Sequence, residues 1–214
     1  MNNSKYPIFW TWYTKTHEEQ AKRLIESCER FEIPIIAEPL SVEKYAKSLE
    51  CVRFVLSHKR FVFKCGLLFL KDRFLSYQKP LFYIHSDTKI FIKPEKSIFE
   101  ENEIGYCISE KEKGQQIIAS HGLYFNWSQI SKDFLNLLTY KCKTIPAERP
   151  TEHGLIRTTL FDFTGYLPDD KLIKDGSKQK FKSNFNLRHF IKPLNGKKKK
   201  YVLSKTNDTY MKWN

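Results

Sequence analysis

A carboxylate and an imidazole lie two residues apart in the sequence Ile84-His85-Ser86-Asp87. In extended backbone, side chains two residues apart project to the same side, so His85 and Asp87 can approach one cation together. A divalent cation held by one or two protein ligands keeps coordination positions for water and phosphate oxygens. The spacing therefore makes Asp87 and His85 candidate ligands of a divalent metal that also binds an anionic ligand.

The run Leu81-Phe82-Tyr83-Ile84 positions this pair, because it ends immediately before His85. Four consecutive apolar residues after Lys79-Pro80 are typical of a strand that is buried on both faces. Open α/β sheets bind ligands outside the carboxyl ends of their strands. We therefore expect His85 and Asp87 at the mouth of a ligand-binding crevice, beside a central strand.

The first forty residues predict a β-α-β unit. The aromatic run from Tyr6 to Tyr13 is typical of a strand, and Thr16 with Glu19 three residues later fits a capping box. The segment Ile33–Ala37 predicts a second strand, parallel to the first. The helix between the strands is indicated by apolar residues at helical spacing, namely Ala21, Leu24, Ile25, Cys28 and Phe31.

The remaining elements predict an α/β protein with a single mixed, mostly parallel central sheet flanked by helices. One helix is expected from Ser57 or Lys59 to Leu75. A second is expected from Ser128 to Thr139, capped by Ser128 or Ser131. The expected additional strands are Thr88–Ile92, Gln116–Ala119, Gly122–Phe125 and a last one entered between Asp162 and Tyr166.

Charge divides the chain of 214 residues, whose net charge is +13. Residues 166–214 hold thirteen Lys and Arg against four Asp and Glu, whereas residues 1–165 are nearly balanced. We expect an α/β core over 1–165 and, over 166–214, a basic segment that completes the cleft. Such a segment suits an anionic partner: a diphosphate, nucleic acid, or an acidic lipid or glycan at a membrane surface.

Composition also narrows the location of the protein. No segment approaches the roughly 20 apolar residues of a membrane-spanning helix, and Met1–Pro7 lacks the features of a secretory signal. The five cysteines are widely spaced without a C-x-x-C pair, so they predict reduced, mostly buried thiols. We expect a cytoplasmic protein, with peripheral contact to the inner face of the membrane as an open alternative.

The segment Tyr83–Ile90 resembles the strand and D-x-D motif of glycosyltransferases with the A-type fold, with His85 in place of the first Asp. Other segments resemble this family in the same order along the chain. These segments are Trp10–Thr14 with the helix after it, Lys64, Ser120–Asn126, Glu152–Ile156 and Arg188–Pro193. The resemblance spans Tyr6 to Pro193 and implies a nucleotide-diphospho-sugar transferase, with residues 1–165 as its nucleotide-sugar-binding core.

The resemblance also implies roles for individual residues. It assigns His189 to the metal beside Asp87 and His85. The implied contacts to the donor nucleotide and diphosphate are Thr11, Tyr13, Lys64, Ser86 and Lys192. The implied lining of the sugar or acceptor site is Gly122, Asn126, Glu152 and His153. For a catalytic residue the candidates Glu152 and Asp162 stay open.

The expected activity is transfer of a hexose or pentose from a nucleotide-diphosphate sugar to an acceptor hydroxyl, assisted by Mn²⁺ or Mg²⁺. Imidazole at His85 favours manganese over magnesium. The sugar, the nucleotide and the stereochemical outcome stay open, and the acceptor is a glycan, a lipid precursor or modified DNA. One alternative is a noncatalytic nucleic-acid-binding protein, favoured by the basic charge and by the interleaved aromatics of Lys178–Tyr201. Another is a degenerate relative that binds a nucleotide sugar without turnover.

Overall fold

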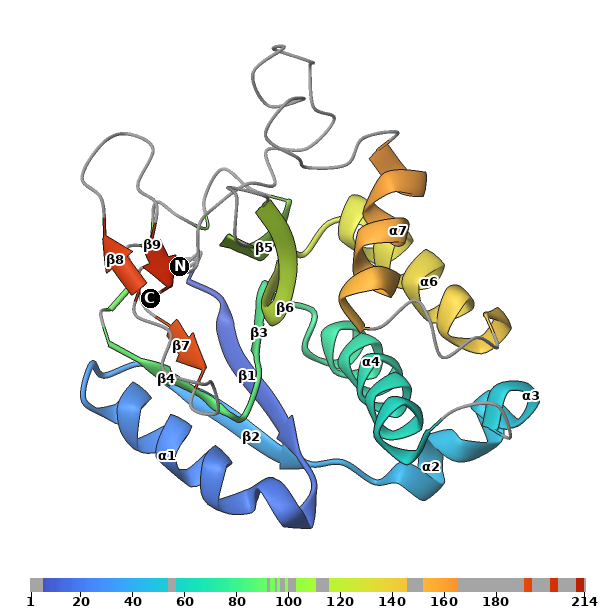
Figure 1. Ribbon diagram of the computed structural model, residues 1–214, viewed down its shortest axis with the longest axis horizontal. Coiled ribbons are helices and arrows are strands. Elements are labelled where there is room, and N and C mark those ends of the chain that lie inside the picture. The colour runs from blue at the N-terminus through green and yellow to red at the C-terminus, as the bar shows by residue number, and fades with distance from the viewer. Residues whose placement is uncertain are drawn as a thin grey trace.

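The computed structural model describes residues 6–53, 57–91, 93, 94, 96, 99, 103–110, 116–145, 152–164, 191–193, 201–203 and 211–213. Most of these residues belong to regular elements (Figure 1). The strands are β1 (Ile8–Tyr13), β2 (Ile35–Pro39), β3 (Leu81–Ile84), β4 (Thr88–Ile90), β5 (Ile104–Glu110), β6 (Gln116–Phe125), β7 (Ile191–Pro193), β8 (Tyr201–Leu203) and β9 (Met211–Trp213). The α-helices are α1 (Glu18–Glu29), α2 (Val42–Ala46), α3 (Glu50–Arg53), α4 (His58–Tyr77), α6 (Gln129–Thr144) and α7 (Glu152–Thr164).

A five-stranded mixed sheet forms the centre, in the order β2-β1-β3-β6-β5. Strands β2 and β3 both pair with β1 in parallel, whereas β6 is antiparallel to both β3 and β5. Within this sheet four strands therefore run in one direction and β6 runs against them. The predicted β-α-β opening and the central position of Leu81–Ile84 are both confirmed, and all four residues of β3 are buried.

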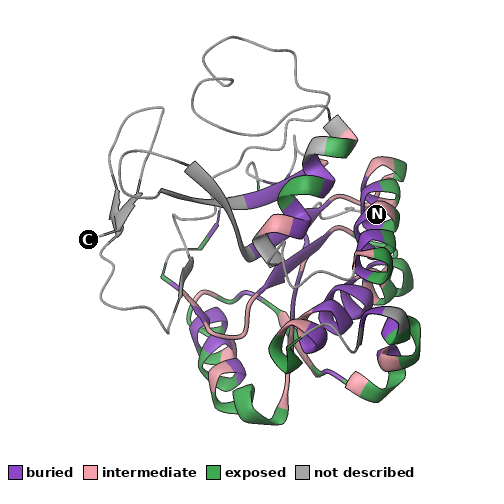
Figure 2. Ribbon diagram, turned by 45° about the vertical axis from the view of Figure 1, so that its right-hand side comes forward, coloured by how far each residue is buried: buried purple, intermediate pink, exposed green. Residues whose placement is uncertain are grey.

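Helices cover both faces of the sheet (Figures 1 and 2). Because side chains alternate along a strand, Phe9 and Phe82 face α1, where they pack with Leu24 and Cys28. The opposite face buries Trp10, Leu81 and Tyr83 in a larger cluster with residues of α4, α6 and α7. The sheet is thus the middle layer of three, with helices on both sides. Burial of both faces explains why β3 carries an uninterrupted apolar sequence.

Helix α4 matches the predicted helix closely, although Gly66 lies in its middle. An ideal Cβ at Gly66 would lie 2.2 Å from Trp12 Cζ2, so the missing side chain is what lets the helix approach the indole. Residues Lys64–Leu70 are all buried. The helix ends at Gln78, whose φ of 52° is the left-handed conformation of many helix termini. Packing therefore outweighs the helix-weakening effect of the glycine.

Of the two predicted helix N-caps, one was right and one was wrong. Ser128 is the N-cap of α6, and its hydroxyl accepts a hydrogen bond from Ser131 N, as predicted. The capping box at Thr16 and Glu19 was wrong, because Lys15–His17 forms a 3₁₀ turn and the N-cap of α1 is His17. The Thr16 hydroxyl instead lies 3.0 Å from His17 Nδ1 and 2.9 Å from Thr14 Oγ1.

The second half of the chain departs further from expectation. The predicted strand at Asp162 was wrong, because Asp162 lies in α7, where Leu155, Ile156 and Leu160 pack into the core. Strand β5 was not predicted at all. Gln116–Phe125 forms one strand instead of two, and its register with β5 shifts between Tyr106 and Cys107. A bulge of this kind interrupts the two-residue periodicity that sequence patterns use to locate strands.

Three short strands belong to the basic segment 166–214. Strand β7 pairs with β4 of the core, and β8 pairs with β9. The described residues do not otherwise test the boundary at residue 165, which stays a prediction. Among the described cysteines, burial raises the pKa of Cys28, Cys65 and Cys142 to about 12, as expected for reduced, inert thiols. In the described part of the chain, no helix is long and apolar enough to cross a membrane.

Candidate active site at the carboxyl ends of β1 and β3

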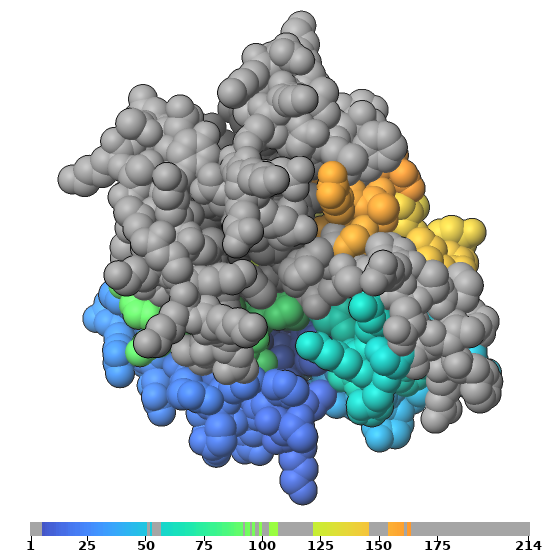
Figure 3. Space-filling view, in the orientation of Figure 1, coloured from blue at the N-terminus to red at the C-terminus, as the bar shows by residue number. Residues whose placement is uncertain are grey.

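The order of the strands places a crevice between β1 and β3. From β1 the chain passes through α1 to β2 on one side, and it then returns through α4 to β3 on the other side of β1. This reversal is the topological switch point at which open α/β sheets bind ligands. Tyr13 ends β1 there, and His85 follows β3. Figure 3 shows a hollow at this position, where dark blue atoms lie recessed between the green and cyan surfaces.

A tight turn holds the segment His85–Thr88. Both the backbone N–H and the hydroxyl of Thr88 donate to the carbonyl oxygen of His85, at 3.1 and 2.6 Å. Thr88 is fully buried, so this double contact fixes the turn to the core. Ser86 and Asp87 therefore lie at the tip of the turn, half-buried at the carboxyl edge of the sheet.

The pair predicted from spacing is close in space. His85 Nδ1 lies 3.7 Å from Asp87 Oδ1, which is too long for a hydrogen bond. Protein ligands lie roughly 2.0–2.2 Å from a transition-metal ion, so a single ion can contact two atoms at this separation. Asp87 Oδ1 is buried and, within the described residues, has no hydrogen-bond partner. A bound cation would satisfy this oxygen, and the two side chains therefore fit a divalent metal.

Aromatic rings fix the position of the His85 imidazole. Its centroid lies 5.4 Å from the ring of Tyr83 on β3 and 6.2 Å from the ring of Phe63 on α4. Phe63 in turn lies 6.3 Å from Trp12, at the end of β1. The first turns of α4 therefore hold His85 in place from the face of the sheet opposite α1.

A second polar cluster, missed in the sequence, follows β1. Thr14 Oγ1 lies 2.8 Å from His17 Nδ1 and 2.9 Å from Thr16 Oγ1; Thr14 is half-buried, and Thr16 and His17 are exposed. This turn and the turn at Asp87 follow the carboxyl ends of two adjacent parallel strands, β1 and β3. Hydroxyl and imidazole groups spaced within four residues of a strand end were the available signal.

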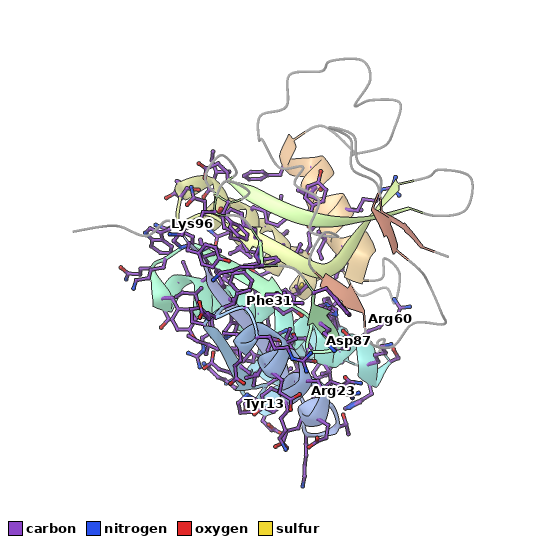
Figure 4. The ribbon with its side chains drawn as sticks, turned by 90° about the vertical axis from the view of Figure 1, so that its left-hand side faces the viewer. Tyr13, Arg23, Phe31, Arg60, Asp87 and Lys96 are labelled. Carbon is purple, nitrogen blue, oxygen red and sulfur yellow. The ribbon has the colours of Figure 1, made fainter. Side chains whose placement is uncertain are left out.

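The first turn of α4 adds a basic group that was also missed. Arg60 lies in this turn and is half-buried, and its backbone N–H donates to the carbonyl oxygen of Ser57. Figure 4 shows Arg60 and Asp87 toward the same end of the molecule, with Lys96 at the other end. The first turns of α4 therefore lie at the end of the sheet that carries His85.

Lys64 does not face this crevice as expected for a diphosphate contact. It is 3% exposed, and its ammonium donates to the carbonyl oxygens of Cys142 and Ile145, at 3.0 and 2.6 Å. These carbonyls lie at the C-terminal end of α6, where a positive charge is favourable. The observed contacts give Lys64 a structural position between α4 and α6.

Two other predicted residues lie away from the crevice. Thr11 is fully buried, and its side chain lies on the same face as Phe9, so it is closed to a ligand in this structure. Asn126 follows Phe125, which pairs with Leu81 at the start of β3. Because β6 runs antiparallel to β3, Asn126 lies at the edge of the sheet opposite Asp87.

Gly122 does reach the crevice, because it pairs with Ile84 at the end of β3. Asp162 does not: it forms an ion pair with Lys141 and lies on the α6–α7 helix pair. Glu152 and His153 begin α7, but their side chains fall outside the described part. Tyr13 is half-buried at the end of β1. The candidate crevice thus contains Tyr13, His85, Ser86, Asp87 and Gly122.

Strand β7 brings part of the basic segment to the same turn. Pro193 pairs with Thr88, next to Asp87, and Lys192 pairs with Lys89. The backbone of Lys192 therefore lies near Asp87, whereas His189 lies outside the described residues. The described residues contain no group of three His, Cys, Asp or Glu side chains that could hold a metal. A cation at Asp87 and His85 would complete its shell with water and phosphate oxygens.

Among the comparisons with known proteins, one solved structure bears on the fold. No family model matches the chain, and no curated protein matches its sequence at a significant level. The galactosyltransferase LgtC, solved with donor and acceptor sugar analogs, matches with a TM-score of 0.51 at 10% identity, over 72% of this chain and 70% of that chain.

Two other solved structures match with lower TM-scores. A glycosyltransferase involved in the glycosylation of the major capsid of PBCV-1 has a TM-score of 0.46 at 11% identity, over 76% of this chain and 79% of its own. Mouse xyloside xylosyltransferase 1 has a TM-score of 0.46 at 8% identity, over 86% and 96%. On the likeness to LgtC, the chain has the mixed-sheet A-type glycosyltransferase fold that its sequence predicted.

Proposed function

We propose that this protein is a glycosyltransferase that moves a sugar from a nucleotide-diphosphate donor to an acceptor hydroxyl. The observation that carries the proposal is the carboxylate of Asp87, which lies 3.7 Å from His85 in a turn at the topological switch point of the sheet. The fold shared with the galactosyltransferase LgtC supports the same reaction class.

Asp87 and His85 would hold the divalent metal, and Mn²⁺ suits a site with one carboxylate and one imidazole better than Mg²⁺. The bound metal would neutralise charge on the departing diphosphate. Asp87 fits this role because its buried Oδ1 has no hydrogen-bond partner among the described residues. The aromatic contacts of His85 with Tyr83 and Phe63 would keep its ring oriented toward the ion.

Neighbouring residues of the crevice would bind the rest of the donor. Tyr13 and Ser86 lie at the ends of adjacent strands and would contact the nucleotide. Gly122, beside Ile84, lacks a side chain and leaves room for the sugar. Lys192 would contact the diphosphate, His189 would add a metal ligand, and Glu152 and His153 would line the acceptor site.

A thermal-shift experiment tests this proposal directly. Uridine, guanosine, adenosine and cytidine nucleotide sugars are added with and without Mn²⁺ to the native chain, to Asp87→Asn and to Asp133→Asn. Asp133 is an exposed carboxylate on α6 and serves as the matched control. A donor at 100 times its dissociation constant stabilises by roughly 2.7 kcal/mol, or about 5–10 °C for a chain of this size.

We expect at least one donor to raise the melting temperature of the native chain and of Asp133→Asn when Mn²⁺ is present. Neither should respond without Mn²⁺, and Asp87→Asn should not respond at all. A shift that survives Asp87→Asn would refute the metal assignment. Stabilisation by duplex DNA without a response to any donor would instead favour the nucleic-acid-binding alternative.

A further inference from the structure

Helix α1 and strand β4 lie side by side and start at the same edge of the sheet (Figure 1). Helix α1 follows the carboxyl end of β1 and leads back to the start of β2, which is parallel to β1. Strand β4 follows the turn at Asp87, and this turn follows the carboxyl end of β3. Figure 4 shows Arg23, in the first half of α1, at the same end of the molecule as Asp87. The N-terminal part of α1 therefore lies at the edge that carries Asp87.

One hydrogen bond fixes the face of α1 that meets β4. The backbone N–H of Ile90 donates to Ser27 Oγ at 3.1 Å, and both residues are buried. Gln20 precedes Ser27 by seven residues, or two helical turns, so it lies on the same face about 10.5 Å closer to the helix N-terminus. From Ile90 back to Thr88, β4 covers only about 6.6 Å. Gln20 therefore lies beyond Thr88, at the level of the turn that holds Asp87.

Two buried acceptor oxygens thus come to the same edge of the crevice. Gln20 is half-buried as a residue, but its Oε1 is buried and has no hydrogen-bond partner within the described residues. The same is true of Asp87 Oδ1. These oxygens cannot satisfy each other, because neither carries a proton to donate. A cation with its bound water would satisfy both, since it supplies the positive charge and the donors that two buried acceptors lack.

We propose that Gln20 is a further oxygen ligand of the divalent cation at Asp87, acting directly or through a metal-bound water. Amide carbonyl oxygens ligate divalent cations as carboxylates do, and groups around a metal commonly accept hydrogen bonds from its ligands. The inference rests on the metal role proposed for Asp87. It adds a side chain from α1 to a site that is otherwise built from the segment after β3, so the cation would link the two elements.

Calorimetric titration of Mn²⁺ into the full chain, without nucleotide, tests the contact. Gln20→Met keeps the length of the side chain but removes the amide oxygen, and Gln20→Glu adds a negative charge at the same position. We expect Gln20→Met to weaken Mn²⁺ binding about tenfold, the lower end of what loss of such a group costs. Gln20→Glu should tighten Mn²⁺ binding about tenfold, because affinity rises with the charge of the ligands.

Lys22→Gln is the matched control, because it lowers the charge of α1 by one unit, as Gln20→Glu does. Lys22 is exposed, and its ammonium lies 2.8 Å from Glu19 Oε1 and 3.6 Å from Glu18 Oε1. Since solvent and salt screen a surface charge, this variant should change Mn²⁺ affinity by less than about twofold.

Thermal unfolding without metal separates a ligand role from a structural one. Gln20 Oε1 has no hydrogen bond to lose within the described residues, so metal-free Gln20→Met should melt within about 2 °C of the native chain. A clearly lower melting temperature would assign the amide to the fold and overturn the inference.

Equal Mn²⁺ affinities of the native chain and Gln20→Met would also overturn it, as would an equal gain in Gln20→Glu and Lys22→Gln. Mn²⁺ binding that needs Asp87 but not Gln20 would leave the metal assignment of the proposed function intact. Binding that needs both side chains, without any response to nucleotide sugars, would refute sugar transfer and keep the role of Gln20. A native chain that does not bind Mn²⁺ would refute both.

Discussion

The ends of β2 and β3 each carry a carboxylate of similar exposure, yet their surroundings differ. Glu38 on β2 is 22% exposed, and a single oxygen accepts hydrogen bonds from Trp10 Nε1, Arg73 Nε and Tyr77 Oη, at 2.6, 2.8 and 3.0 Å. Asp87 after β3 is 29% exposed, and the described nitrogen that approaches its carboxylate is His85 Nδ1, at 3.7 Å. The exposed fraction alone therefore does not distinguish Glu38 from Asp87.

The two carboxylates differ in how many hydrogen-bond donors surround them. Three donors from β1 and α4 compensate the desolvation of Glu38, which makes it a cross-link between the sheet and the helix. Asp87 Oδ1 has lost water without gaining a hydrogen-bond donor within the described residues, an arrangement that a bound cation would stabilise. One carboxylate thus suits the fold, and the other suits a ligand.

The largest expected effect is on activity at Asp87. Asp87→Asn keeps the shape of the side chain but removes the charge that would hold the metal. We expect sugar transfer to fall at least 100-fold, which corresponds to about 2.7 kcal/mol of transition-state stabilisation. The free energy of unfolding should stay within about 0.5 kcal/mol or increase.

A transfer assay and urea unfolding on the same preparations measure both quantities, with Asp133→Asn as control. A destabilised Asp87→Asn variant would mean that Asp87 belongs to the fold in the way Glu38 does, and the contrast between the two strand ends would disappear.

The reverse result is expected at Glu38. Glu38→Ala leaves the fully buried Trp10 indole without its acceptor and removes the partner of Arg73. We expect the free energy of unfolding to fall by about 2–3 kcal/mol, while the Mn²⁺-dependent stabilisation by donor is unchanged. Urea unfolding with Glu43→Ala, an exposed carboxylate on α2, provides the comparison. A loss of Mn²⁺ response without destabilisation would assign Glu38 to the ligand instead.

The contrast also explains which residues could be predicted from the sequence. The four apolar residues of β3 and the two-residue spacing of His85 and Asp87 are local patterns, and both gave the right geometry. The whole central strand order follows from the β-α-β opening and from a buried strand that returns beside it. Local periodicity was therefore sufficient for the centre of the fold and for the closeness of His85 and Asp87, whose role as metal ligands stays a prediction.

Contacts between distant segments were not predictable in this way. Lys64 contacts carbonyls 78 and 81 residues further along the chain, which no local pattern encodes. Asn126 was expected near the sugar, but the antiparallel direction of β6 moves it to the other edge of the sheet. The side chains that donate hydrogen bonds to Glu38 come from β1 and from the second half of α4. Its full set of hydrogen bonds was therefore equally unpredictable from the sequence.

Lys64 offers an intermediate effect that sharpens the contrast. Lys64→Met keeps the length of the apolar stem but leaves two carbonyl oxygens at the end of α6 without their donor. We expect a loss of about 1–2 kcal/mol in the free energy of unfolding and no change in the dissociation constant of the donor. Urea unfolding and donor titration are compared with Lys79→Met, an exposed lysine. A tenfold weaker donor affinity at unchanged stability would restore the diphosphate role.

The smallest effect is a pH dependence of the Glu38 cross-link. Burial, followed by the hydrogen bond to Glu38, raises the pKa of Tyr77 to about 12. A phenol whose pKa is higher in the folded state than its unfolded value of roughly 10 favours folding below that pH. Its contribution is lost as the pH rises from about 10 to 12.

Tyr77→Phe removes this contribution, so its free energy of unfolding should decline less steeply than that of the native chain above pH 10. Other tyrosines with raised pKa values, such as Tyr45, contribute the same loss of stability in both proteins, so they cancel in the comparison. Urea unfolding between pH 9 and about 11.5 measures the difference, with the exposed Tyr140→Phe as control. Identical slopes for native chain and Tyr77→Phe would show that the phenol is not coupled to Glu38, leaving Trp10 and Arg73 to hold that carboxylate.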